Sequence, residues 1–169
     1  MSSDQSTMME QCAAFNQTGP EHASIARFAG TFRAEVKIWM SPGQPPMTST
    51  GTMVSTTILG GRFLRQDYKD DSGMFEGAGF WGYNTVDKRF EGFWIDSMAT
   101  FFQLERGRHE PGEDKYVMEG TMTDPGGGGT VRKRSIIRFL GADRHSMEMF
   151  FGTPDGGEFR GMEIQYTRA

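Results

Sequence analysis

Residues 31–40 alternate between apolar and polar side chains. Phe32 and Ala34 occupy one set of alternate positions, whereas Arg33 and Glu35 occupy the other. A period of two is typical of a β-strand, because successive side chains in a strand point to opposite sides. The pattern therefore predicts a strand that faces a core on one side and solvent on the other.

Nine further segments of strand character follow, separated by short clusters rich in Gly, Pro, Asn and Asp. Short links join antiparallel neighbours, and a long antiparallel meander hides its edges most simply by closing on itself. We therefore expect an all-β fold, an antiparallel up-and-down β-barrel of about ten strands. The expected strands cover residues 31–40, 48–59, 62–69, 74–83, 89–97, 100–108, 115–123, 130–140, 145–152 and 158–168.

The N-terminal part of the chain does not share this period. Residues 1–19 are polar and lack a repeat, so we expect a flexible tail. A short helical pattern follows from His22 to Ala29, with Ile25 and Phe28 on one face. Residues 20–169 are thus expected to form a single barrel domain, with this helix plugging one end.

The composition supports strands and excludes several classes of protein. The 169 residues include 14 Phe, 13 Met and 23 Gly, and the net charge is −4. A mildly acidic chain lacks the basic surface that nonspecific nucleic-acid binding needs. The single cysteine, Cys12, excludes an internal disulfide, and no apolar run is long enough for a transmembrane helix. We expect a cytoplasmic protein without nucleic-acid or membrane partners.

The two ends of the predicted barrel resemble those of the calycin superfamily, which includes lipocalins and fatty-acid-binding proteins. Gly30-Thr31-Phe32 after a short helix is similar to the Gly-x-Trp signature of lipocalins. Arg168 is similar to the basic residue that packs over the aromatic ring of that signature. The resemblance implies that Gly30, Phe32 and Arg168 close the barrel, with the guanidinium of Arg168 on the ring of Phe32.

A closer resemblance covers residues 22–168 and links the chain to a bacterial family of unknown function, DUF1579. It implies a calycin-like barrel and no established activity. Asn84 stands where the family usually has Asp. The blocks that resemble the family are His22-x-x-Ile25-x-x-Phe28-x-Gly30, Leu59-Gly60-Gly61-Arg62-Phe63-Leu64, Gly82-Tyr83-Asn84, Trp94-Ile95-Asp96-Ser97, Asp124-Pro125 and Glu163-Ile164-x-Tyr166-Thr167-Arg168.

The leading hypothesis for function is a binding module for a small apolar or amphipathic ligand. A barrel of about ten strands is wider than one that side chains alone fill, so we expect an internal cavity. Trp94 would stack on the ligand, and Gln66, Tyr68, Asp96 and Ser135 would supply hydrogen bonds. Unbranched Met side chains suit adaptable apolar pockets, although they also replace the scarce Leu in an ordinary core. The apolar side chains expected inside are Leu64, Met98, Met118, Met122, Met147 and Met149.

Two other classes of function remain open. In an enzyme, Asp96 would act as general acid/base on a hydrophobic substrate in the same cavity. Alternatively, Asp96 caps the turn near Met98 by accepting backbone N–H bonds. The third hypothesis is a partner-binding or structural protein without a ligand.

No cofactor or metal is expected from the motifs. The stretch from Gly77 to Gly82 matches G-x-G-x-x-G, but a turn and another strand follow where dinucleotide binding needs a helix. The three histidines lack metal-ligand spacing. His145 begins a strand with Met147 and Met149, which makes it a candidate haem ligand, with a satisfied rim histidine as the alternative.

Residues 80–104 are apolar on both faces of their predicted strands. Phe90 and Trp94 lie on one face, and Phe93 and Ile95 lie on the other. Burial inside the barrel accounts for one face only, and monomers seldom expose a large apolar patch. A homodimer that pairs Phe93 and Ile95 with their symmetry mates is the simplest explanation.

Overall fold

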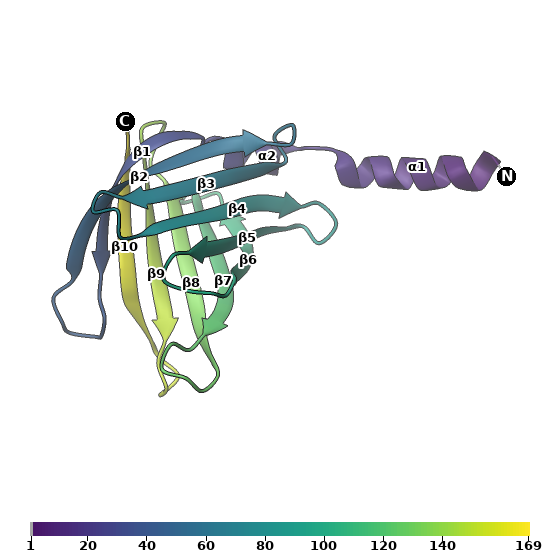
Figure 1. Ribbon diagram of the computed structural model, residues 1–169. Helices are drawn as coiled ribbons and strands as arrows, with labels where there is room; N and C mark the ends of the chain where they lie inside the picture. The colour runs from purple at the N-terminus through teal and green to yellow at the C-terminus, as the bar shows by residue number, and fades with distance from the viewer. Residues whose placement is uncertain (1) are drawn as a thin grey trace.

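The computed structural model describes residues 2–169 and shows a single closed β-barrel (Figure 1). Each strand pairs antiparallel with the next one in sequence, and β1 pairs with β10 to complete the ring. The predicted ten-stranded barrel is therefore confirmed. Its elements are α1 (Ser2–Asn16), α2 (Pro20–Ala26), β1 (Gly30–Ile38), β2 (Met47–Ile58), β3 (Phe63–Asp70), β4 (Glu76–Asn84), β5 (Arg89–Asp96), β6 (Gln103–Glu110), β7 (Lys115–Thr123), β8 (Thr130–Phe139), β9 (Arg144–Gly152) and β10 (Glu158–Arg168).

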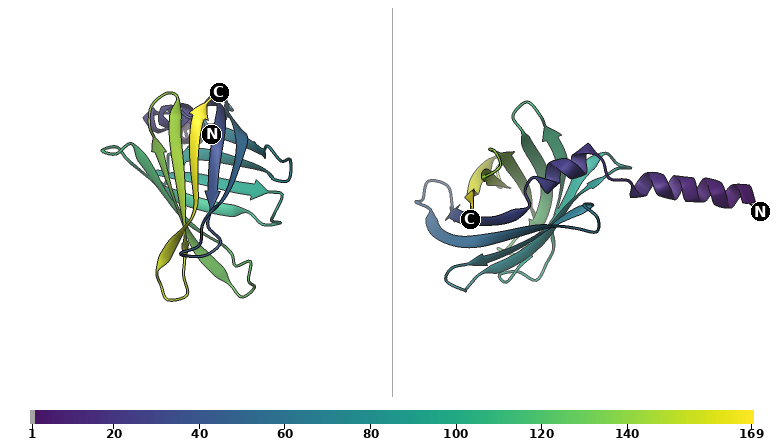
Figure 2. Two further views of the ribbon diagram at one scale, coloured as in Figure 1. Left: turned by 90° about the vertical axis from the view of Figure 1, so that its left-hand side faces the viewer. Right: turned by 90° about the horizontal axis from the view of Figure 1, so that it is seen from above.

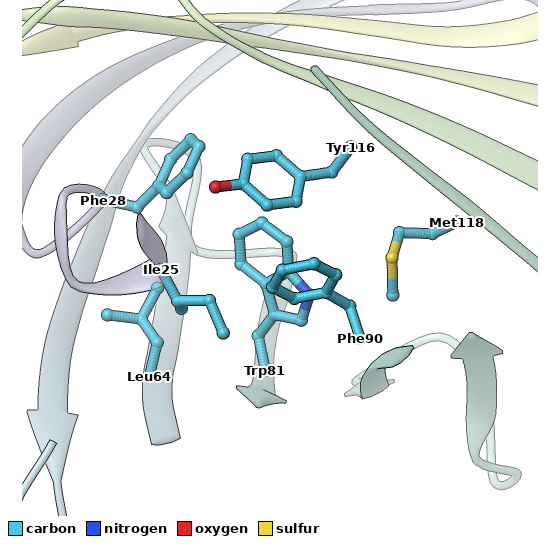
Figure 3. Close-up of a cluster of buried hydrophobic side chains, with 7 residues drawn as sticks. All are labelled: Ile25, Phe28, Leu64, Trp81, Phe90, Tyr116 and Met118. Atoms are coloured by element: carbon cyan, nitrogen blue, oxygen red, sulfur yellow. The ribbon is translucent and has the colours of Figure 1, made fainter. Parts of the chain in front are cut away.

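Helix α2 lies at one end of the barrel, which we call the plugged end. Pro20 opens the helix, and the backbone N–H of Gly19 donates to His22 Nδ1 at 3.0 Å. Ile25 and Phe28 are almost fully buried and lie among side chains from β3, β4, β5 and β7 (Figure 3). This plugged-end core consists of Ile25, Phe28, Leu64, Trp81, Phe90, Tyr116 and Met118.

A charged contact fastens α2 to the turn between β6 and β7. The guanidinium of Arg27 donates to both carboxylate oxygens of Asp114 at 2.8 Å, and it also donates to the hydroxyl of Tyr116. The hydrogen bonds from Arg27, together with one from His109, lower the pKa of Asp114 to about 2. The bidentate pair therefore holds the helix in place at the barrel end.

The first and last strands meet in the register that barrel closure requires. Phe32 is opposite Arg168, whose guanidinium lies 4.6 Å from the centre of the Phe32 ring. Arg168 also donates to the carbonyl oxygens of Ala29 and Ala142. Gly30 has a φ of 139°, and a Cβ there would overlap the Arg168 guanidinium. A glycine is thus required at position 30, at the seam where β1 meets β10.

The opposite end, which we call the open end, carries the loops 39–46, 71–75, 97–102, 124–129 and 153–157. A second core lies along the wall formed by β1, β2, β3 and β10. It consists of Phe32, Ala34, Val36, Met53, Tyr68, Ile164 and Tyr166.

Residues 1–19, expected to be a flexible tail, contain α1, which points away from the barrel (Figures 1 and 2). Met1 lies outside the described residues. Arg62 donates to the side-chain and backbone oxygens of Asn16, which holds the last residue of α1 near α2. Among residues 2–169, the structure contains no helix of the length and apolar character that crossing a membrane requires.

Candidate functional site

Two glycines of β4 make room for an indole ring inside the barrel. A Cβ on Gly77 or Gly79 would overlap the side chain of Trp94 on β5. Trp94 also packs against the second core, so its ring lies on the inner face. Although it faces inward, Trp94 is only partly buried. Its ring is therefore accessible to a molecule in this half of the barrel.

A chain of polar side chains continues from Trp94 along the inner wall. Trp94 Nε1 and Gln103 Nε2 both donate to Asp96 Oδ2 at 3.1 Å. Lys133 Nζ donates to Gln103 Oε1 at 3.0 Å, and Ser135 Oγ donates to Glu105 Oε1 at 2.6 Å. We call these six residues of β5, β6 and β8 the inner polar chain.

The inner polar chain contains a buried ion pair. The side chain of Lys133 is 3% exposed and that of Glu105 is 17% exposed, and Lys133 Nζ lies 3.7 Å from Glu105 Oε1. Strand β7 separates them, and it places Gly120 directly between the two residues. A side chain at this position would collide with the backbone of Leu104. Glycine therefore allows the two charged side chains to meet across β7.

Thioether side chains of β7 and β9 lie beside the inner polar chain. Met118 pairs with Ser135 across β7 and β8, and Met149 pairs with Ser135 across β8 and β9. Met118 and Met149 are buried, whereas Met147 is partly buried. Apolar and hydrogen-bonding groups thus alternate on one inner surface. Among residues 2–169, no group of three or more His, Cys, Asp or Glu side chains is arranged to hold a metal ion.

A comparison with protein families places residues 17–168 in a family described as a protein of unknown function, DUF1579. The chain belongs to the DUF1579 family. The match covers the whole barrel and α2, as the sequence blocks predict. A comparison with curated proteins found none that matches this chain.

In this DUF1579 protein, two predicted ligand-binding residues lie on the β3 wall. Gln66 donates to Ser55 Oγ at 3.4 Å, and Tyr68 is buried in the second core beside Phe75. Burial is the main reason that the pKa of Tyr68 is raised. Across Gly77 and Gly79 of β4, Tyr68 is in register with Asp96 and Gln66 is in register with Trp94, so only these glycines separate the two residues from the inner polar chain.

Asp96 is on the inner face but also ends its strand. Its Oδ1 accepts the backbone N–H of Met98 at 3.0 Å, which is the capping contact anticipated as an alternative. Met98 was expected inside, and this placement is wrong. The chain leaves the sheet after Asp96, so Met98 lies in the 97–102 loop with 77% exposure.

His145 lies at the plugged end, away from the inner polar chain. It stacks on Tyr166 at 4.3 Å, and the edges of Phe28 and Phe32 contact it. Met122, another residue expected inside, is partly buried on β7 near the open end.

Three residues of the inner polar chain are missing from the sequence prediction, namely Gln103, Glu105 and Lys133. Polar or charged residues occupy both faces of β6, so the apolar alternation gives no inward direction there. Lys133 shares a face of β8 with the predicted Ser135, but its charge is typical of a surface residue. The available clue is Gly120. A glycine inside an otherwise regular strand is typical of a position that a neighbouring backbone or side chain approaches closely.

Two concave features lie near the open end of the barrel. A groove of about 760 Å³ crosses β6, β7, β8 and β9 near the open end, with Leu104, Arg106, Arg132 and Phe150 among its lining residues. A second pocket of about 500 Å³ lies beside the 97–102 loop, with Tyr68, Ile95 and Asp96 among its lining residues. Phe102 contributes to both.

Proposed function

We propose that this protein binds a small amphipathic molecule in the open-end half of the barrel. The inner polar chain is the observation that carries the proposal. Buried ion pairs seldom stabilise a fold more than apolar side chains of similar size would. The buried Lys133 and its partners therefore favour a role in binding the polar group of a ligand. Met118, Met147 and Met149 would provide the surface for its apolar part.

The charge of the inner polar chain favours a ligand with hydrogen-bond donors. Asp96 and Glu105 contribute two formal negative charges, and Lys133 contributes one positive charge. A carboxylate ligand would meet this excess of negative charge, whereas a hydroxyl or ammonium group would be attracted to it. The partly buried ring of Trp94 adds an aromatic surface that also attracts cations. The preferred ligand is therefore an apolar molecule with an amine or hydroxyl group.

Fluorescence titration with dodecylamine, dodecanol and dodecanoate tests this proposal, because the three probes differ only in the polar group. We expect dodecylamine and dodecanol to quench the tryptophan emission at concentrations at least tenfold lower than dodecanoate does. Trp94→Phe should remove the response. Trp39→Phe should keep it, because Trp39 stacks with Arg160, outside the inner polar chain.

Native mass spectrometry of protein purified from its own host provides an independent check. We expect a co-purified small molecule. Absence of such a molecule, together with no response to any probe, would contradict the binding function. A stronger response to dodecanoate would leave binding intact and overturn the assigned polar group.

An enzymatic role for Asp96 is the alternative function, and experiments should distinguish it from ligand binding alone. Three N–H donors already occupy its carboxylate, which favours a positioning role in the site. Asp96→Asn keeps the shape of the side chain. Ligand turnover that Asp96→Asn abolishes, with unchanged unfolding free energy, would support catalysis instead.

A further inference from the structure

Strands β5 and β6 form the shortest strand pairing of the barrel. Within residues 2–169, five residue pairs join them, ending with Trp94 opposite Gln103, whereas seven to nine pairs join every other two neighbouring strands. Ile95 and Asp96 of β5 lie beyond the last of these pairs and are paired with β4 alone. The wall of the barrel is therefore interrupted between β5 and β6 at the open end.

The 97–102 loop spans this interruption. In Figure 1, β2–β5 run across the view and β7–β10 run nearly upright, and the loop lies in the angle between them. Hydrogen bonds hold the beginning of the loop. The backbone N–H of Ser97 donates to the carbonyl of Glu76 at 2.9 Å, and Ser97 Oγ accepts the N–H of Glu76 at 3.1 Å. The backbone N–H of Met98 donates to Asp96. The rest of the loop lies outside the strands, so it can move without breaking the sheet.

The 500 Å³ pocket is bounded by this loop and reaches the inner face of the barrel. Its lining includes Phe101 of the loop together with Tyr68, Gly77 and Asp96. Tyr68 is opposite Gly77, and Gly77 is opposite Asp96, so these three residues form one row across β3, β4 and β5. Because Tyr68 is buried in the second core, this row belongs to the inner face. The pocket therefore connects the loop with the interior.

The inner end of the pocket meets the inner polar chain. A Cβ on Gly77 would lie 2.2 Å from Cζ2 of Trp94, so the indole ring covers this glycine. Asp96, which also lines the pocket, accepts hydrogen bonds from Trp94 and Gln103. A molecule in the pocket would thus meet the first members of the inner polar chain.

The lining of the pocket suits the passage of an apolar group. Ile95, Ala99, Phe101 and Phe102 contribute apolar side chains, and a volume of about 500 Å³ is typical of sites for small molecules. The 760 Å³ groove differs, because its lining includes five charged side chains of β6, β7, β8 and β10. Contact of an apolar chain with these groups would remove water from them at a cost in free energy. They are Arg106, Glu119, Arg132, Arg134 and Glu158.

We propose that the 500 Å³ pocket is the entrance to the binding site and that the 97–102 loop is its movable wall. The ligand passes between the loop and β4, meets the ring of Trp94 and then reaches the rest of the inner polar chain. This inference rests on the proposed binding function and adds the route by which the ligand enters and leaves.

Stopped-flow fluorescence with dodecanol tests the entrance. Ala99→Phe places an aromatic ring in the lining of the pocket, and we expect the association and dissociation rates to fall at least about tenfold. Thr123→Phe is the matched control, because it adds the same ring to the lining of the 760 Å³ groove and should change neither rate. Neither substitution adds a tryptophan, so the emission of the same three tryptophans is compared.

A second variant changes the rates in the opposite direction. Ser97→Ala removes the side-chain oxygen that accepts the N–H of Glu76, which loosens the loop. We expect faster association and dissociation of dodecanol than in wild type. Loss of folded protein cannot accelerate binding, so this variant keeps the test valid if Ala99→Phe folds poorly, which circular dichroism would show.

The possible outcomes separate the entrance from the binding function. Wild-type rates in both Ala99→Phe and Ser97→Ala, or equal slowing by Ala99→Phe and Thr123→Phe, would overturn the entrance and leave binding intact. A wild-type protein whose emission responds to none of the dodecyl probes would overturn the binding function, and the entrance with it.

Discussion

His145 shows how the aromatic packing of the plugged end governs a single ionisable group. Its ring is 4% exposed and is enclosed by Tyr166, Phe28 and Phe32. Burial lowers its pKa to about 4, and the nearby positive charge of Arg168 contributes. A neutral imidazole held among aromatic rings favours a role in the core over that of a metal ligand.

The stability of the protein should therefore depend on pH through His145. The pKa is 6.5 in an ordinary environment and about 4 in the folded protein. Between these values the unfolded chain binds a proton that the folded chain does not, so the unfolding free energy falls as the pH is lowered. The fall is roughly 3 kcal/mol in total. Urea unfolding at pH 7 and pH 4.5 should show most of this loss in wild type and a smaller loss in His145→Gln, because carboxylates such as Glu148 with a lowered pKa also contribute. An equal loss in both would contradict the assignment.

At the scale of elements, local patterns predict the strands better than they predict which way the strands face. The alternation of Phe32, Ala34 and Val36 gives both the strand and its buried face. The glycines of β4 have no side chain, so the sequence does not indicate which face of β4 points inward. They leave room for the ring of Trp94 on the next strand, which a local pattern cannot show. Lys133 looks like a surface residue in sequence, because its burial depends on Glu105 reaching across Gly120. Helix α1 was not predicted, since its residues show no clear apolar period.

Gly77 provides a test of the space that β4 reserves for the indole. Gly77→Ala should force Trp94 from its place and lower the unfolding free energy by about 1–3 kcal/mol, as overpacking in a core does. The near-ultraviolet circular dichroism of the tryptophans should change as well. Gly112→Ala is the control, because no atom lies within 4 Å of the added Cβ and the substitution should be nearly neutral. Equal unfolding free energies for Gly77→Ala and wild type would show that the space is not needed.

The whole molecule depends on one seam, where β1 meets β10. Seven residue pairs join these strands, from Phe32 with Arg168 to Ile38 with Met162. The sequence blocks at the two ends of the chain predict this contact, although nothing in them predicts that Arg168 also bonds to the carbonyl of Ala142 in the β8–β9 turn. The side chain of Arg168 thus connects the β1–β10 seam with the β8–β9 turn and with Ala29, the residue before β1.

Removal of that side chain should weaken the whole barrel. Arg168→Ala loses the contact with the Phe32 ring and leaves the carbonyls of Ala29 and Ala142 without this donor. We expect a loss of about 1–3 kcal/mol in urea unfolding. Arg65→Ala, which removes an exposed ion pair with Asp67, should cost under about 1 kcal/mol. A smaller effect at Arg168 than at Arg65 would show that the seam does not limit stability.

The pairing of β1 with β10 also has a consequence for biosynthesis. A ribosome makes β1 early and β10 last, so a nascent chain holds β1 and β9 without one neighbour each until the final strand emerges. Open strand edges are templates for pairing with other chains. Contacts between residues so distant in sequence also form slowly. Messages that stop before β10 should therefore yield products that aggregate or require chaperones, whereas the full-length product protects both edges at once.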